Sequence, residues 1–167
     1  MAPRLALLLA GLWLGALLLS WAVATLNFRT VDRVLGPTAG PGLEQHLAPL
    51  PAPERRVVFR HLVAEINRGL FQGFGLAQLV IGSGLLLAAW RVGGWAKPVA
   101  LLALAFVFLQ VALGIPITSL GRAIDFVPRP LPDAVRQRFG MLHGAFVLLD
   151  LAKAGLLATL AVILARR

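Results

Sequence analysis

The chain has no cysteine and no tyrosine, and only seven of its 167 residues are acidic. Without cysteine, disulfides, thiolate chemistry and clusters held by cysteine ligands are all excluded. The sequence also carries no phosphate-binding nucleotide loop and no HExxH zinc motif. We therefore predict no catalytic residue, no metal ligand and no obligatory cofactor from motifs alone.

What the chain does contain is hydrophobic sequence, at 59% of its residues, against about 45–50% in soluble domains. Apolar runs of about 20 residues recur, enough to cross a hydrocarbon core of about 30 Å. We predict an all-α, polytopic membrane four-helix bundle that forms one integral membrane domain over residues 1–167. The net charge of +9 is explained by basic residues beside anionic headgroups, so the bilayer is the expected partner and nucleic acid is not.

The four predicted spans share length and apolar character, and they cover about residues 5–26, 70–90, 97–115 and 139–165. Long loops over 27–69 and 116–138 then lie on one side of the membrane. That side carries ten positive charges and the other five, with Lys153 inside a span. The count favours long loops in the cytoplasm of a bacterial inner membrane, although the short side has the denser charge.

The first span begins with a basic residue and ends near Ala22-Val23-Ala24, a triplet that resembles a signal-peptidase site. Its apolar stretch is longer than the usual 7–15 residues of a signal peptide, so we expect a retained helix. Gly11 and Gly15 form a GxxxG pair, which is expected to let a neighbouring helix approach closely.

Two segments suggest an internal repeat. Residues 25–32 and 118–125 both fit T-x-x-x-R-x-[VI]-D, which aligns Arg29 with Arg122, and an offset of 71 aligns Gln72 with His143. Two hairpins of the same orientation would form a parallel repeat about the membrane normal. Chance similarity in a sequence rich in Leu, Ala and Gly is the alternative.

Polar residues gather where the second span begins. Pro53 and Glu54 predict a helix start, and the helix can run unbroken into the span. Helical spacing puts His61, Glu65, Arg68 and Gln72 on one stripe, for which a solvated helix face is the alternative. Because the chain alternates direction, one side of the membrane collects a polar vestibule. Its candidate residues are Arg29, His61, Glu65, Asn67, Arg68, Gln72, Arg122 and His143, with Asn27, Asp32 and Asp125 at the same level.

The fourth span, whose helix is expected to start at Pro132-Asp133, holds Asp150 and Lys153. Either charge alone would cost about 2.5–3.5 kcal/mol at a helix centre, but the two can pair at i, i+3. His143 lies two turns before Asp150 on the same side of that helix. We predict a buried clamp between helices, with a proton relay through Glu65, His143 and Asp150 as the alternative.

Other positions carry narrower expectations. Gln72 and Gln78 suit hydrogen bonds between helices, and the third span contributes Gln110. Pro116 is expected to end or kink the third helix. The segment 35–53, rich in Pro and Gly, is predicted not to form a helix.

Three stretches carry a family resemblance: GLWLGALLLSWAVATLNFR, RHLVAEINRGLFQGFG and RFGMLHGAFVLL. Through them the chain resembles the transmembrane-protein-205-like family of four-span membrane proteins. AEINRGLF is also similar to the anthrone-oxygenase-like four-span family, in which an Asn-Arg pair opens a span. Both resemblances imply the four-span architecture, and neither supplies a catalytic residue.

Three functions fit these patterns. The first is an accessory or scaffold subunit of a larger membrane complex, with other membrane protein subunits as partners. The second is a redox protein that holds a quinone or a b-type haem, in which His61 and His143 ligate the iron and arginines receive the propionates. The third is a small-molecule membrane enzyme or transporter that uses the polar vestibule.

Overall fold

The computed structural model describes residues 1–36, 41–127 and 129–166. Five helices follow one another along the chain: α1 (Ala2–Val34), α2 (Pro41–Leu47), α3 (Ala52–Val92), α4 (Ala96–Ile124) and α5 (Asp133–Ala165). Within those three ranges no β-strand occurs. The helices α1, α3, α4 and α5 are long and apolar enough to cross a membrane. The predicted all-α membrane bundle is confirmed, and the four helices fit an integral membrane protein.

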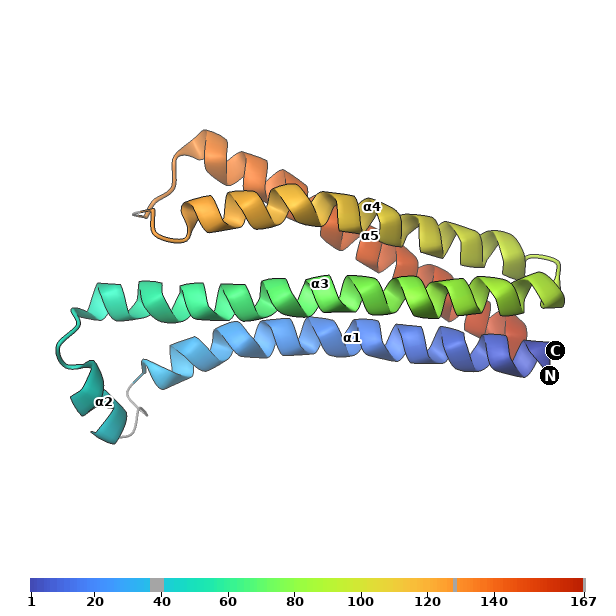
Figure 1. Cartoon of the computed structure of the whole chain (residues 1–167), viewed down its shortest axis with the longest axis horizontal. Coiled ribbons are helices and arrows are strands. Elements are labelled where there is room, and N and C mark those ends of the chain that lie inside the picture. The colour runs from blue at the N-terminus through green and yellow to red at the C-terminus, as the bar shows by residue number, and fades with distance from the viewer. Residues whose placement is uncertain (37–40, 128, 167) are drawn as a thin grey trace.

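The four long helices pack in a ring in the order α1, α3, α4, α5, with α5 returning to α1 (Figure 1). Both termini lie at the end where α3 turns into α4, which we call the terminal end. The connections α1–α3 and α4–α5 lie at the opposite end, the loop end. Toward the loop end α5 separates from α1, so the ring is closed at the terminal end and splayed at the loop end (Figure 1).

Proline and glycine set several helix boundaries. α3 has Pro in its first turn and Glu54 as its acidic residue there, while α5 begins at Asp133 after Pro132. Both predicted starts are confirmed. Gly93 and Gly94, at φ 73° and 58°, adopt the left-handed conformation that glycine tolerates and make the tight turn into α4.

Two expected interruptions of helices do not occur. The third helix does not end at Pro116, because α4 continues to Ile124, and one missing backbone N–H removes a single bond from a long helix whose other bonds remain. The segment 35–53 contains the helix α2, which holds Glu44 in its first turn and His46 in its last turn. The acidic Glu44 in the first turn suits the positive N-terminal end of the helix dipole.

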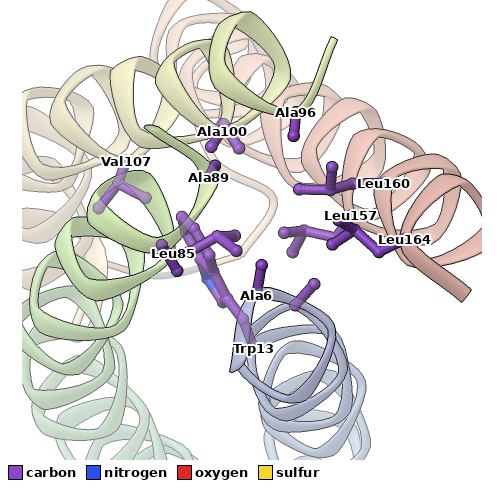
Figure 2. Close-up of a cluster of buried hydrophobic side chains, with 13 residues drawn as sticks. Ala6, Trp13, Leu85, Ala89, Ala96, Ala100, Val107, Leu157, Leu160 and Leu164 are labelled. Atoms are coloured by element: carbon purple, nitrogen blue, oxygen red, sulfur yellow. The ribbon is translucent and has the colours of Figure 1, made fainter. Parts of the chain in front are cut away.

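The core lies at the terminal half of the bundle and consists of Trp13 together with alanines, leucines and a valine (Figure 2). Trp13 of α1 is fully buried. Alanines from α1, α3 and α4 and leucines from α5 belong to the same cluster. A Cβ atom on Gly82 of α3 would lie only 2.7 Å from the Trp13 ring. Gly82 is therefore the close-approach glycine that lets α3 accept this tryptophan.

The GxxxG pair in α1 does not serve this purpose. Gly11 and Gly15 are exposed, and a Cβ atom added to either would meet no atom within 4 Å. Trp13 lies midway between them in the sequence and faces the core. Residues two positions before or after it on a helix, here Gly11 and Gly15, therefore point away from the core. Close packing of α1 depends instead on Ala6 and Ala10, which are fully buried.

Candidate functional site

The intramembrane charges form a network that joins three helices, which we call the span network: Trp21, Gln110, Asp150 and Lys153. Lys153 Nζ lies 2.9 Å from Asp150 Oδ1 on α5. Gln110 of α4 donates from Nε2 to Asp150 Oδ1 at 2.6 Å and accepts a hydrogen bond from Lys153. Trp21 of α1 donates from Nε1 to Asp150 Oδ2 at 3.1 Å. The predicted pair is thus a three-helix junction.

Burial makes this junction costly to disturb. Lys153 is 0% exposed, and Gln110 and Asp150 are nearly as deeply buried. Across the described ranges, every buried side-chain nitrogen or oxygen has a hydrogen-bond partner. A paired charge in hydrocarbon loses much of its insertion cost, whereas a single one would retain it.

A neutral hydrogen bond supports α1 and α3 closer to the terminal end. Trp13 donates from Nε1 to Oε1 of Gln78 at 3.0 Å, and both side chains are buried. The predicted helix-to-helix role of Gln78 is confirmed. Gln72 is exposed, and its side chain makes no hydrogen bond in the described part of the chain, so the same expectation for Gln72 is not met.

The loop end holds a second network, the loop-end cluster: His61, Glu65, Arg68, Arg122 and Asp125. Two forked pairs join α3 to α4. Arg68 donates two hydrogen bonds to Asp125, from Nη1 to Oδ2 at 2.8 Å and from Nη2 to Oδ1 at 2.9 Å. Arg122 donates two to Glu65, from Nε to Oε1 and from Nη2 to Oε2, both at 2.9 Å. Bidentate guanidinium–carboxylate pairs are the strongest form of such contacts.

Further contacts tie the two pairs together. Arg68 also donates to Glu65 at 2.5 Å, as the i, i+3 spacing predicts. His61 Nδ1 lies 2.8 Å from Asp125 Oδ2, and its ring packs on Phe126 with centroids 4.7 Å apart. A Cβ atom on Gly121 would lie 3.0 Å from Arg68 Nη2, so the bare glycine leaves space for the guanidinium.

Electrostatics keeps Glu65 ionised. This residue precedes the apolar segment 70–90, at the loop end. Its hydrogen bonds to Arg122 and then to Arg68 lower its pKa from 4.5 to about 2, against a smaller opposing effect of desolvation. The Glu65 carboxylate in turn raises the pKa of Arg122. A carboxylate with this pKa takes up no proton near neutral pH, which weighs against a relay through Glu65.

The lowered pKa gives a pH prediction. Because the folded pKa lies below 4.5, the stabilisation from Glu65 is fully present above about pH 4.5 and is lost as the pH falls toward 2. We expect α3 and α4 to separate at the loop end over this interval. The chain lacks cysteine, so spin labels on cysteines introduced at the exposed positions Leu62 and Ala123 can report the distance between the helices.

The matched variant is Glu65→Gln, which removes the titrating group and keeps the shape of the side chain. It should show a broadened distance distribution already at neutral pH, and a smaller change between pH 4.5 and 2. A wild-type distance that first broadens well above pH 4.5 would contradict the lowered pKa of Glu65.

His61, Glu65 and Asp125 also place one ligand atom each within 4.8 Å of one another. That spacing alone would suit a metal ion. Each of the two carboxylates, however, already binds a guanidinium at 2.9 Å or less. A divalent ion would have to displace both arginines, so the contacts describe an ion-pair cluster between two helices.

The remaining predicted polar residues divide into two groups. Asn67 is buried, accepts a 2.6 Å hydrogen bond from Asn27 and donates to the Ala24 carbonyl, which joins α3 to α1. Arg29 and His143 are exposed. The His143 ring stacks on Phe139 with centroids 6.0 Å apart, and the described contacts do not bring either residue into the loop-end cluster.

His143 and Asp150 lie on the same side of α5 but have different surroundings. Asp150 is buried and binds Trp21 of α1 and Gln110 of α4, whereas His143 is exposed and stacks on Phe139 of its own helix. A spacing of two turns therefore does not give the two residues the same burial. No contact links the two side chains in the described ranges.

The ring order of the helices is one that a two-fold axis would map onto itself, as the predicted repeat requires. The polar contacts do not follow that symmetry. Asp32 of α1 pairs with Arg56 and Arg60 of α3 at 3.3 and 3.7 Å. Its counterpart Asp125 should pair with α5, but it also pairs with α3. The repeat stays a prediction.

Sequence reasoning did not find Trp21 as a member of the span network. A signal was available, because a tryptophan N–H within a span needs an acceptor, and Asp150 is the acidic residue of the four apolar segments. It also placed Gln110 in the third span without giving it a partner. The partners of Trp21 and Gln110 can be assigned only when the rotation of each helix about its own axis is known.

Comparison of the chain with protein-family models, curated proteins and solved structures found no match. The likeness to the transmembrane-protein-205-like and anthrone-oxygenase-like families remains a prediction. What the geometry shows is a membrane bundle with two polar networks, each closed between its own helices.

Proposed function

We propose that the protein is an accessory or scaffold subunit of a larger membrane complex. The observation that carries this proposal is that the buried polar groups of the span network bind one another. Asp150 and Lys153 bind each other, Gln110 and Trp21. Groups held in this way rigidify a bundle, whereas a catalytic acid or a transport site needs at least one group free to bind substrate.

The outer surface supports the same role. Large apolar side chains are exposed on the outside of each long helix, including Leu8, Val80, Phe108 and Leu148 at 60–75% exposure. In a bilayer such faces contact lipid tails or the helices of another subunit. At the loop end Phe126 is also 61% exposed, beside the loop-end cluster. We propose this end and the adjoining helix faces as the contact region for another membrane subunit.

The test is photo-crosslinking in the native membrane. A crosslinking amino acid is placed singly at Phe126, Leu148, Leu8 and Val80, and the adducts are identified by mass spectrometry. We expect one recurrent protein from positions on one contiguous face and none from the other faces. Tagging that partner should recover this protein in return. Only lipid adducts from every face, together with a lone monomer in native nanodiscs, would refute the accessory role.

The haem alternative remains a prediction with its own measurement. His61 Nδ1 is held by Asp125, and His143 lies exposed on α5. The propionates would be received by Arg29, Arg68 and Arg122. Of these, Arg68 and Arg122 are bound to carboxylates, and Arg29 is exposed. A Soret band in the purified protein that His61→Ala and His143→Ala each remove would establish the haem and overturn the accessory proposal.

A further inference from the structure

The terminal end carries a groove on the outside of the bundle. It has a volume of about 420 Å³ and lies between α1 and α3. Leu5 and Leu9 form one wall, Gly84 and Leu87 the floor and the other wall, and Trp90 and Arg91 lie at one end. Leu5 and Leu87 are 49% and 71% exposed, so the groove opens outward, toward lipid.

The groove is apolar along its length and basic at one end. Lys97 Nζ lies 3.3 Å from the centroid of the Trp90 ring, which brings a second cation to the end of the groove that Trp90 and Arg91 line. Exposed tryptophans together with basic side chains mark the headgroup level of a membrane. The apolar wall formed by Leu5 and Leu9 then extends from that level along the first helix.

No acidic side chain balances these cations. Six of the seven acidic residues belong to the loop-end half of the chain's fold, and Asp150 is engaged in the span network. Within the described ranges Arg91 and Lys97 have no carboxylate partner. The terminal end therefore has a local excess of positive charge, to which a phosphate group is complementary.

We propose that this groove binds one anionic phospholipid. Its phosphate contacts Arg91 and Lys97 at the headgroup level, and one acyl chain lies over Gly84 between Leu9 and Leu87. The groove has free space over Gly84, because a Cβ atom there would meet only Leu9 Cδ1, at the ordinary contact distance of 3.6 Å. A larger side chain at this position would occupy the place of the acyl chain. The lipid site shares no lining residue with the span network, on which the proposed accessory role rests.

Native mass spectrometry of the full chain in detergent tests the site with two lipids of the same acyl chains, phosphatidylglycerol and phosphatidylcholine. We expect one phosphatidylglycerol to bind at least about fivefold more tightly than phosphatidylcholine, since each nearby cation contributes about that factor. The double change Arg91→Gln with Lys97→Gln should remove the preference. Gly84→Leu should weaken binding of both lipids at least about fivefold.

Two variants serve as matched controls. Gly11→Leu also adds a side chain to a glycine, but Gly11 is exposed and lies outside the groove, and a Cβ atom there would meet no atom within 4 Å. Arg166→Gln removes a cation of the terminal end that does not line the groove. Both should bind the two lipids as the wild type does. Circular dichroism and melting curves identify any variant that has lost its fold. If either the Arg91/Lys97 double variant or Gly84→Leu is unfolded, the lipid site is tested with the one that remains folded.

Three results would overturn the proposal. These are equal affinity for the two lipids, an unchanged preference in the folded Arg91/Lys97 variant, and unchanged binding in folded Gly84→Leu. Glycerol phosphate is the further arm, because it offers the phosphate without acyl chains. Full displacement of phosphatidylglycerol by an equal concentration of glycerol phosphate would show a free-phosphate site instead.

Discussion

Asp150→Leu is expected to lower the free energy of unfolding of the protein in bicelles by about 3–5 kcal/mol. The substitution leaves the Lys153 ammonium, which is 0% exposed, without its carboxylate. It also removes the acceptor of Trp21 Nε1 and one partner of Gln110. Reversible unfolding by denaturing detergent, followed by circular dichroism, measures the loss.

The chain offers a matched control on the same helix. Asp133 and Arg136 also pair at i, i+3, with 2.6 Å between Oδ1 and Nη2, but their side chains are 89% and 69% exposed. Asp133→Leu should cost less than about 1 kcal/mol, because exposed pairs and helix-dipole contacts are weak. Similar losses for Asp133→Leu and Asp150→Leu would show that burial adds nothing to the span network.

Trp13→Ala is expected to be the second most damaging change, at about 3 kcal/mol, the low end of the cost of truncating a buried aromatic residue. Lipid tails are as apolar as the core, so the loss comes from packing and not from transfer out of water. The cavity would open beside Gly82, where an added Cβ atom would lie only 2.7 Å from the Trp13 ring. Gln78 would also lose its hydrogen-bond donor. The same unfolding assay measures this change.

Trp95→Ala is the control for Trp13→Ala, because Trp95 is 75% exposed. We expect a loss within about 0.5 kcal/mol, as for other surface substitutions. A Trp13→Ala protein as stable as Trp95→Ala would mean that the core shown in Figure 2 does not hold the bundle together.

The parts of the fold that depend on spacing along one helix could be predicted from the sequence. Apolar length predicts the four membrane helices, and Pro132 marks the start of α5. The pairs Glu65–Arg68 and Asp150–Lys153 follow from the i, i+3 geometry. These features need no knowledge of how one helix lies against another.

The partners across helices could not be predicted in the same way. A membrane helix is apolar on its core face and on its lipid face, so hydrophobic periodicity does not show which side turns inward. This explains why Gly11 and Gly15 face outward while Gly82 packs under Trp13. It also explains why the partner of Asp150 on α1, Trp21, needed the structure.

Splaying of the bundle is the other effect that spacing does not reveal. Two turns of helix align His143 with Asp150, yet Asp150 binds Trp21 of α1 while His143 is exposed, and α5 separates from α1 toward the loop end (Figure 1). The position of a helix against its neighbour is set by side-chain packing along its whole length. The polar vestibule predicted from the sequence therefore divides into the α3–α4 loop-end cluster and residues that stay exposed.

The claim that the intramembrane charges act as a helix clamp is tested most directly by a double-mutant cycle. The unfolding free energies of Asp150→Leu, Lys153→Leu and the combined change are measured in the same bicelles. We predict that the combined change costs less than Asp150→Leu alone, because no unpaired charge then remains in the bilayer. Damage from the double change equal to the sum of the two single losses would contradict the clamp.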